Sequence, residues 1–360
     1  MVRRTPVARE LTFAFPGDIN TLTGGYLYDK RVIGGLRELG WDVQALSLDA
    51  SFPWPSESVR QASAIALSQV KASSLLVVDG LALGALGAQA GAIASTRPYL
   101  ALVHHPLALE SGLSPEQSES LFLSEYEALR HADQVIVTSP TTATTVQEQF
   151  QVPRDKIHVV LPGIDRSPMK PIPRSAHDPL RLLSVGAIVP RKAFDVLISA
   201  LAQLRALPWR LTIVGDDTRA PETSAQLRCL IRTSGLLDRV RLTGSVQPEE
   251  LSACYADSDA FVSASRYEGY GMALAEALAW GLPIIATTGG AVVQTVPAQT
   301  GLLVAPDNPE SLAQAIQRLL TDDEKRNAMA TAAREHADSL PTWLQSAQCF
   351  AAALTSGHTQ

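Results

Sequence analysis

The sequence predicts an α/β protein made of two doubly wound parallel-sheet domains. Its 360 residues, 46% of them apolar and 18% charged, suffice for about two globular cores. Short β-branched or leucine-rich runs alternate with amphipathic stretches, a rhythm typical of parallel sheets covered on both faces. This rhythm occurs twice, on either side of a proline-rich segment at 165–179.

The first half is expected to form a Rossmann-like domain over residues 1–165. The clearest helical periodicity in it runs over 115–131. The apolar stretch 75–94 is interrupted by Asp79 and several glycines, so we interpret it as a strand, a loop and a buried helix rather than a membrane span. The expected strands of this half are 11–15, 42–48, 75–78, 99–104, 134–138 and 157–160.

The second half is expected to form a second Rossmann-like domain over residues 181–340. Four prolines and a lack of apolar periodicity mark an interdomain linker at 166–180. Residues 341–360 are predicted to form a terminal helix. Because ligands of open α/β sheets bind beyond the carboxyl ends of the strands, the strand-to-helix loops carry most weight. The expected strands of this half are 182–185, 210–214, 240–242, 260–263, 283–287 and 301–304.

Composition excludes some classes of function. The net charge of −6 argues against a nucleic-acid partner, whose binding depends on clustered Lys and Arg. The N-terminus does not have the pattern of a signal peptide, which favours a cytoplasmic protein. The three cysteines lie too far apart for a metal site or a disulfide framework: Cys229, Cys254 and Cys349.

A glycine loop between a strand and a helix, at 263–283, is suited to bind phosphate. Gly269 and Gly271 let the backbone approach a ligand, and the following helix N-terminus favours an anion such as a diphosphate. A dinucleotide fingerprint and a plain tight turn are the alternatives. The fingerprint would need a small residue where Leu274 stands and an acidic residue at the end of the next strand, and the sequence has neither.

Glu268 and Glu276 flank this loop and are eight residues apart. On a continuous helix that spacing is roughly 12 Å, too far for a facing pair of glycosidase carboxylates. The two carboxylates are instead expected to reach different parts of one elongated ligand. Glu276 lies among Ala, Leu and Trp, so it needs a hydrogen-bond partner, either a ligand hydroxyl or a structural group such as a backbone amide.

The segment from Glu268 to Glu276 resembles the E-x7-E signature of the retaining glycosyltransferases of family 4. The resemblance implies the GT-B fold, in which two Rossmann-like domains face a central cleft and the terminal helix, here 341–360, crosses back to the first domain. It implies that 1–165 is the acceptor-binding domain and 181–340 the nucleotide-sugar-binding domain. It also implies a reaction without a metal ion or other cofactor. Further segments that match in the family's order are 185–201, 213–216, 244–251 and 289–306.

The resemblance implies a role for each matching residue. Glu268 would contact donor sugar hydroxyls, and Glu276 would contact the ribose. Arg191 and Lys192 would bind the diphosphate, the arginine with a fork of hydrogen-bond donors and the lysine with a single point charge. The family usually has Lys-Gly where this chain has Lys192-Ala193. The other donor-binding positions are Gly24, Gly25, Gly186, Val246, Gly269, Tyr270, Gly271 and Met272.

Two histidines, His104 and His105, end the fourth expected strand. Family members place a histidine beside the donor sugar, and we assign His104 to that position and to the catalytic group with Arg191, Lys192 and Glu268. Neighbouring strand residues point to opposite faces, so one of the two histidines is expected to face substrate. Packing at a strand end is the alternative. His105 and Asp79 are assigned to the acceptor side.

The expected reaction is the transfer of a hexosyl unit from a UDP- or GDP-linked sugar to an acceptor hydroxyl with retention, in glycolipid or cell-envelope polysaccharide synthesis. Alternatives are a nucleotide-sugar epimerase, a phosphorylase, or a non-catalytic sugar-nucleotide-binding module. The acceptor is a lipid or a saccharide. The protein could bind peripherally to the inner face of the membrane through residues 52–55 and basic residues of the first domain. The alternative is that these basic residues are solvated surface charges. They are Arg3, Arg4, Lys30, Arg31 and Arg37.

Overall fold

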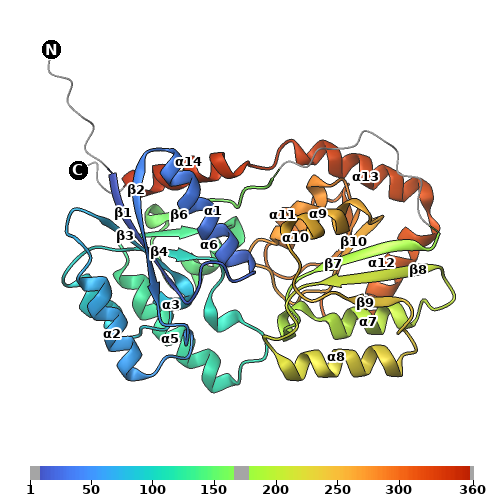
Figure 1. Cartoon of the computed structure of the whole chain (residues 1–360), viewed down its shortest axis with the longest axis horizontal. Helices are drawn as coiled ribbons and strands as arrows, with labels where there is room; N and C mark the ends of the chain where they lie inside the picture. The colour runs from blue at the N-terminus through green and yellow to red at the C-terminus, as the bar shows by residue number, and fades with distance from the viewer. Residues whose placement is uncertain (1–8, 166–177, 357–360) are drawn as a thin grey trace, which may run out of the picture. The chain divides into compact units, whose positions relative to one another are not determined.

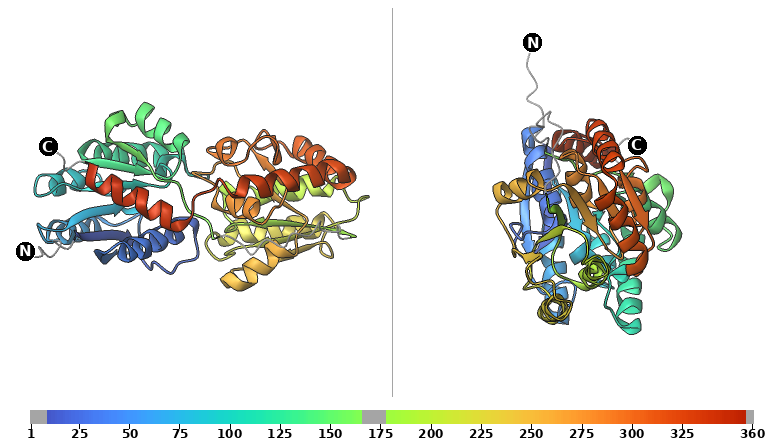
Figure 2. Two further views of the ribbon diagram at one scale, coloured as in Figure 1. Left: turned by 90° about the horizontal axis from the view of Figure 1, so that it is seen from above. Right: turned by 90° about the vertical axis from the view of Figure 1, so that its right-hand side faces the viewer.

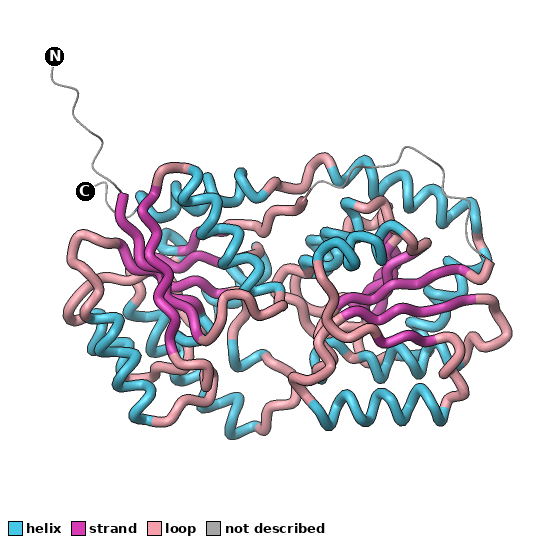
Figure 3. Tube along the Cα trace, in the orientation of Figure 1, coloured by secondary structure: helices cyan, strands magenta, loops and turns pink. Residues whose placement is uncertain are grey.

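The computed structural model describes residues 9–165 and 178–356, which form two compact units. One unit takes the chain up to Gly163 together with the segment from Pro341 onward, and the other is Ile164–Leu340. Each unit contains one six-stranded parallel sheet with helices on both faces, as Figures 1 and 3 show. The predicted α/β class with two Rossmann-like units is therefore confirmed.

The first unit has its sheet in the order β2-β1-β3-β4-β5-β6, and all six predicted strands are confirmed. β1 pairs in parallel with both β2 and β3, so the winding reverses between β1 and β3. The loops after these two strands therefore lie at the topological switch point. The strands are β1 Arg9–Pro16, β2 Trp41–Leu48, β3 Leu75–Asp79, β4 Leu100–Val103, β5 Gln134–Val137 and β6 Ile157–Val159.

Helix boundaries in this unit follow capping side chains. Thr23 accepts a hydrogen bond from the Tyr26 amide at the start of α1, and Ser114 forms a capping box with Gln117 at the start of α5, the helix predicted at 115–131. The helices are α1 Gly24–Glu38, α2 Glu57–Ser68, α3 Gly80–Leu83, α4 Gln89–Ala94, η1 Leu107–Leu109, α5 Pro115–His131, α6 Pro140–Glu148, η2 Arg154–Lys156 and α14 Trp343–Ser356.

The second unit has the order β12-β11-β10-β7-β8-β9, and its six predicted strands are also confirmed. Here the winding reverses between β7 and β10, which pair in parallel. The loops that follow β7 and β10 are consequently neighbours at the carboxyl edge of the sheet. The strands are β7 Leu180–Val185, β8 Trp209–Val214, β9 Val240–Leu242, β10 Ala260–Ser263, β11 Ile284–Thr287 and β12 Gly301–Val304.

In Figure 1, α7, α8 and α12 cover one face of the second sheet and α9, α10 and α13 the other. The helices α7, α10 and α12 each bury an apolar stripe in the core of this unit, at about 1.5–3 kcal/mol per large side chain. The helices are η3 Pro190–Lys192, α7 Phe194–Ala202, α8 Pro221–Thr233, α9 Pro248–Ala256, α10 Met272–Ala279, α11 Val292–Thr295, α12 Pro309–Thr321 and α13 Asp323–Ala337.

The terminal helix α14 packs on α1 of the first unit and is drawn in red beside it in Figures 1 and 2. Phe350 stacks on Phe13 with ring centroids 6.1 Å apart. A Cβ added to Gly35 would lie 2.5 Å from the Ala347 methyl, so a glycine is required where the two helices cross.

Parts of two expectations fall outside the described residues. Of the linker expected at 166–180, residues 166–177 are not described, and neither are Arg3 and Arg4. Among the helices that are described, none combines the length and apolar character needed to cross a bilayer.

Candidate functional site

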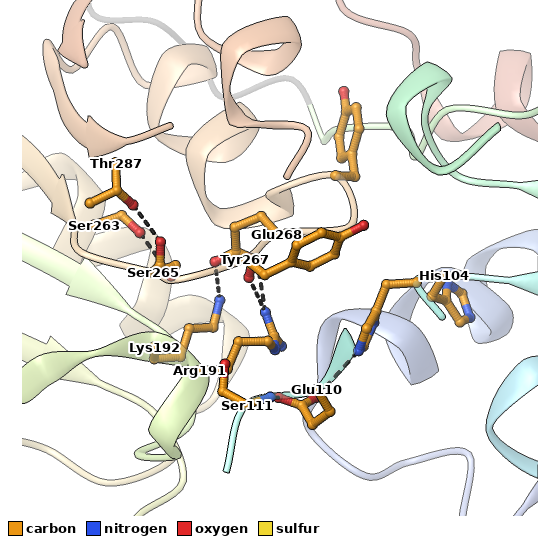
Figure 4. Close-up of polar contacts among 12 residues, drawn as sticks. His104, Glu110, Ser111, Arg191, Lys192, Ser263, Ser265, Tyr267, Glu268 and Thr287 are labelled. Atoms are coloured by element: carbon orange, nitrogen blue, oxygen red, sulfur yellow. Dashed lines mark hydrogen bonds and ion pairs between the residues drawn. The ribbon is translucent and has the colours of Figure 1, made fainter. Parts of the chain in front are cut away.

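The loops after β7 and β10 bring two cations onto one carboxylate. Lys192 Nζ lies 2.6 Å from Glu268 Oε1, and Arg191 Nη1 lies 3.3 Å from Glu268 Oε2. The same guanidinium nitrogen donates a 2.7 Å hydrogen bond to the Tyr267 carbonyl. Figure 4 shows both basic side chains pointing toward Glu268. The structure thus brings together three residues predicted to be catalytic.

The triad is largely desolvated. The side chains of Arg191 and Lys192 are each 16% exposed, and that of Glu268 is 9% exposed. Burial raises the pKa of Glu268, but the charges of Lys192 and Arg191 outweigh burial and lower that pKa to about 2. The cluster is one carboxylate with two cations, so it keeps an excess positive charge that suits an anionic ligand.

Glycines allow the loops to approach so closely. A Cβ on Gly186 would lie 2.8 Å from Lys192 Cε, so the lysine stem runs against the bare glycine backbone. Behind the carboxylate, Gly290 adopts φ +67°, and the Ala291 amide donates a 2.8 Å hydrogen bond to the Glu268 carbonyl. The Gly289–Gly290 pair thus fixes the backbone that carries Glu268.

Replacing Gly290 by Ala is expected to lower the free energy of unfolding by about 3 kcal/mol and to abolish activity. Its Cβ would lie 2.3 Å from the Glu268 carbonyl oxygen and would add a side chain at positive φ. Urea denaturation measures this effect. Gly34→Ala is the control, because a Cβ at this helical glycine meets no atom within 4 Å. An equal effect of the two substitutions would contradict the assigned role of Gly290.

Arg266 joins the same loops from outside the triad, and the sequence analysis missed it. Its amide donates a 2.8 Å hydrogen bond to the Arg191 carbonyl, and its guanidinium contacts the Pro190 carbonyl and pairs with Asp307 at 2.7 Å. These contacts hold the turn that carries Arg191 against the β10 loop. Its position in a loop rich in polar residues gave no signal that set it apart from a solvated arginine.

Hydroxyl groups support the base of the β10 loop (Figure 4). Ser263 Oγ lies 3.1 Å from Ser265 Oγ, and Thr287 donates a hydrogen bond to the Ser265 carbonyl. They satisfy polar groups of a segment that is otherwise buried.

The predicted glycine loop leads directly into α10. Gly271 caps this helix with φ +90°, Met272 is its first residue, and Gly269 and the buried Tyr270 connect it to Glu268. The Thr295 hydroxyl anchors the loop by donating to the Tyr270 carbonyl at 2.5 Å. The positive end of α10 therefore lies close in sequence to the triad, as an anion site requires.

Two details of Glu276 differ from the prediction. Because α10 begins at Met272, the segment from Glu268 to Glu276 is not one continuous helix, and the 12 Å spacing does not apply. Glu276 is half-buried rather than buried, and one of its partners is the Tyr255 hydroxyl, at 2.8 Å. Tyr255 is itself buried, so it fixes the position of this carboxylate.

Removing the hydroxyl by Tyr255→Phe is expected to cost about 1 kcal/mol of stability and to raise the KM for a nucleotide sugar several-fold. Steady-state kinetics test this. Tyr99→Phe is the matched control, because its buried hydroxyl donates to the Ala128 carbonyl at 2.6 Å in the first unit. The control is expected to lose similar stability with an unchanged KM, and equal KM values for the two variants would contradict the positioning role of Tyr255.

Two positions covered by the family resemblance lie just before helices. Val246 is half-buried in the loop before α9. Ala193 caps α7 with φ +49° and ψ +42°, the left-handed conformation that glycine adopts most easily. The alanine found where the family usually has glycine therefore keeps the backbone shape expected of glycine.

In the first unit, the switch-point loops and β4 bring His104 onto two carboxylates. Its Nε2 lies 3.1 Å from Asp29 Oδ1 and 3.1 Å from Asp79 Oδ2. Gly25, near the start of α1 behind Gly24, lies against the imidazole, since a Cβ there would be 3.4 Å from His104 Cδ2. The sequence analysis missed Asp29, whose signal was an acidic residue on the apolar face of α1.

Burial lowers the pKa of His104, but the carboxylates of Asp29 and Asp79 raise it to about 10. Burial and the charge of Asp79 raise the pKa of Asp29 to about 7 against the opposing effect of His104. One atom of each side chain lies within 4.8 Å of the others, a spacing that a divalent cation could also use. Here the carboxylate oxygens contact the imidazole directly.

His105 has a different partner from His104. Its Nε2 lies 3.3 Å from Glu110 Oε2, whereas His104 contacts Asp29 and Asp79. The two neighbouring histidines therefore occupy different surroundings, and the structure gives His105 no contact with Asp79 among the described interactions.

Most of the described residues assigned to membrane contact are buried or interact with other residues of the first unit. Phe52 is buried in the core, while Trp54 is 49% exposed. Lys30 donates to Asn20, Arg31 lies over the Trp343 ring, and Arg37 donates to the Val43 carbonyl.

Two protein families match successive parts of this chain. The family described as Glycosyl transferases group 1 matches residues 165–336, and the one described as Glycosyltransferase Family 4 matches residues 51–168. D-inositol 3-phosphate glycosyltransferase of Corynebacterium diphtheriae is 29% identical over 249 residues, covering 65% of this chain and 58% of that protein. The matched region therefore spans less than two thirds of that relative.

Solved structures show the same fold. Sucrose-phosphate synthase of Thermosynechococcus elongatus superposes with a TM-score of 0.80 at 22% identity, covering 95% of this chain and 98% of the other. HepE of Anabaena in complex with UDP-glucose gives 0.75 at 21% identity, covering 96% and 100%. The two family matches, which together span residues 51–336, show that the chain belongs to glycosyltransferase family 4. The structural similarities show that it has the GT-B fold.

Proposed function

We propose that this protein transfers a hexosyl unit from a UDP- or GDP-linked sugar to the hydroxyl of a lipid or saccharide acceptor, with retention at the anomeric carbon and without a metal ion. The observation that carries the proposal is the convergence of Arg191 and Lys192 on Glu268 beside the start of α10. The UDP-glucose complex of HepE and the relative named for inositol 3-phosphate support a nucleotide-sugar donor and a hydroxyl acceptor.

The cations act on the leaving group. As the bond from the anomeric carbon to the diphosphate oxygen breaks, negative charge develops on that oxygen. Arg191 and Lys192 are held in place before substrate binds, so they stabilise this charge without reorganising. Glu268 orients both cations and is placed to accept hydrogen bonds from donor hydroxyls, while Glu276 is assigned to the ribose.

Retention follows from attack on the face that the diphosphate leaves. The acceptor oxygen forms its bond to the anomeric carbon, and its proton passes to the departing phosphate oxygen, so no side-chain nucleophile is used. Trapping a stable glycosyl-enzyme adduct would contradict this mechanism. Acceptors of both classes fit a role in glycolipid or cell-envelope polysaccharide synthesis, at the inner face of the membrane when the acceptor is a lipid.

Radiolabelled UDP- and GDP-hexoses, incubated in EDTA with lipid, saccharide and polyol phosphate acceptors, test the proposal. Transfer of label to an acceptor with the anomeric configuration conserved is expected. Isomerised donor would identify an epimerase, phosphate-dependent cleavage a phosphorylase, and nucleotide binding without turnover a non-catalytic module, and each of these would overturn the proposed transfer. Loss of turnover in EDTA that added Mg²⁺ restores would overturn metal independence.

A further inference from the structure

The cluster of Asp29, Asp79 and His104 in the first unit has a charge arrangement that the proposed transfer does not explain. The two carboxylates come from different elements, α1 and the end of β3, and are 1% and 4% exposed. Desolvating one carboxylate costs several kcal/mol, and placing a second beside it costs more. Such a pair persists where a cation compensates it, and His104 is the group that both carboxylates contact.

The two ring nitrogens of His104 have different surroundings. Both carboxylates lie at Nε2 of His104, which therefore carries a proton and donates it toward them. Nδ1 hydrogen-bonds to no residue within 9–165 or 178–356, and it is not among the buried polar atoms that lack a partner. The second ring nitrogen is thus accessible to a ligand while the first is held.

The ring plane is held as well. The Tyr28 ring meets the imidazole edge-on, with centroids 5.3 Å apart and planes at 84°, and Gly25 lies against its Cδ2 edge. The Tyr28 hydroxyl donates to the Val160 carbonyl at 3.0 Å, which anchors that ring. Asp79 is fixed in turn, because its other oxygen accepts a 2.8 Å hydrogen bond from the Leu81 amide.

We propose that Asp29 and Asp79 are positioning residues that hold His104 as an imidazolium, so that its Nδ1–H donates a hydrogen bond to a substrate oxygen. His104 is then a fixed donor rather than a general base, because a doubly protonated ring has no lone pair to accept a proton. The substrate role rests on the proposed transfer reaction, whereas the protonation state does not.

The charged groups that face the imidazole are the two carboxylates, and Tyr28 is the other titratable side chain against it. These groups determine the direction in which the pKa of His104 shifts. Burial disfavours the imidazolium and the carboxylates favour it, with a net raised pKa in the folded protein. Removing one carboxylate is therefore expected to lower the pH at which His104 loses a proton.

Nitrogen-15 NMR of the histidine rings measures this directly in the full chain. In the wild type, both nitrogens of His104 are expected to stay protonated through pH 8.5, and in Asp29→Asn the titration midpoint is expected to fall by about two pH units. Glu127→Gln is the matched control, because it removes the carboxylate that lies 3.0 Å from His131 and is expected to leave His104 unchanged.

Kinetics give the second readout. Between pH 6.5 and 8.5, kcat/KM of the wild type and of Glu127→Gln is expected to change by less than about twofold, whereas that of Asp29→Asn falls by about fourfold as His104 deprotonates. If Asp29→Asn does not fold, the His104 titration in Asp79→Asn and the wild-type spectrum test whether the carboxylates hold His104 as an imidazolium. An inactive protein whose His104 is an imidazolium leaves the positioning intact and places the failure in the proposed transfer.

Three outcomes overturn the proposal. One is a neutral His104 at pH 7 in the wild type, and another is an unchanged His104 titration in a folded Asp29→Asn variant. The third is stoichiometric binding of Zn²⁺ or Mn²⁺ that shifts the His104 Nε2 resonance, because the cluster would then be a cation site.

Discussion

Lys192→Met is expected to lower kcat/KM about 10²- to 10³-fold with saturable donor binding retained. The substitution keeps the apolar stem that packs on Gly186 and removes the ammonium that lies 2.6 Å from Glu268. One fixed charge aimed at a developing anion in a desolvated site typically contributes that much. Because Arg191 still contacts Glu268, the carboxylate is not left without a partner.

Initial rates of sugar transfer measure this effect, with thermal unfolding as a check on folding. Lys192→Arg restores the charge and is expected to recover part of the rate, limited by the different shape of the guanidinium. Arg210→Met removes an exposed cation from β8 of the same unit and is expected to change the rate less than twofold. A folded Lys192→Met variant with full activity would contradict the assignment.

Glu268→Gln is expected to lower the free energy of unfolding by about 3 kcal/mol at pH 7, because a pKa lowered by roughly two to three units in the folded state corresponds to that energy. The pH dependence of this contribution follows from the lowered pKa of Glu268. A carboxylate whose pKa falls on folding stabilises the protein above its unfolded pKa, near 4.5, and that contribution is lost as the pH falls toward 2.

Urea denaturation of wild type and Glu268→Gln between pH 7 and pH 3 tests this dependence. The difference is expected to be constant above about pH 5 and to shrink below it. Asp217→Asn breaks the ion pair with Arg228, which is 55% exposed, and should cost less than about 1 kcal/mol. A difference between wild type and Glu268→Gln that does not vary with pH would mean that the Glu268 charge does not stabilise the fold.

The strands were predictable because each is a short apolar run bounded by turn residues, and buried parallel strands need little else. The convergence of Lys192 and Glu268, 76 residues apart, was predictable through the strand-to-helix loops, since carboxyl ends of parallel strands share one edge. Local sequence thus located the cluster of Arg191, Lys192 and Glu268.

The remaining contacts depend on tertiary packing. Asp29 faces His104 across 75 residues, and Tyr255 reaches Glu276 from a different helix. The apolar face of α1 sets Asp29 apart from a carboxylate exposed to water, but nothing in that periodicity identifies His104 as its partner. Likewise, Ala193 shows no sequence sign of its left-handed backbone, because alanine ordinarily favours the right-handed helix.

Isothermal titration of UDP and GDP in EDTA, against wild type and the Arg191→Ala/Lys192→Ala variant, tests most directly whether these two side chains bind the diphosphate. We predict that the nucleotide which binds wild type loses at least about 100-fold in affinity in the variant, while the corresponding nucleoside is unaffected. Equal affinity of the diphosphate for both proteins, or binding to wild type that requires a divalent ion, would contradict the account.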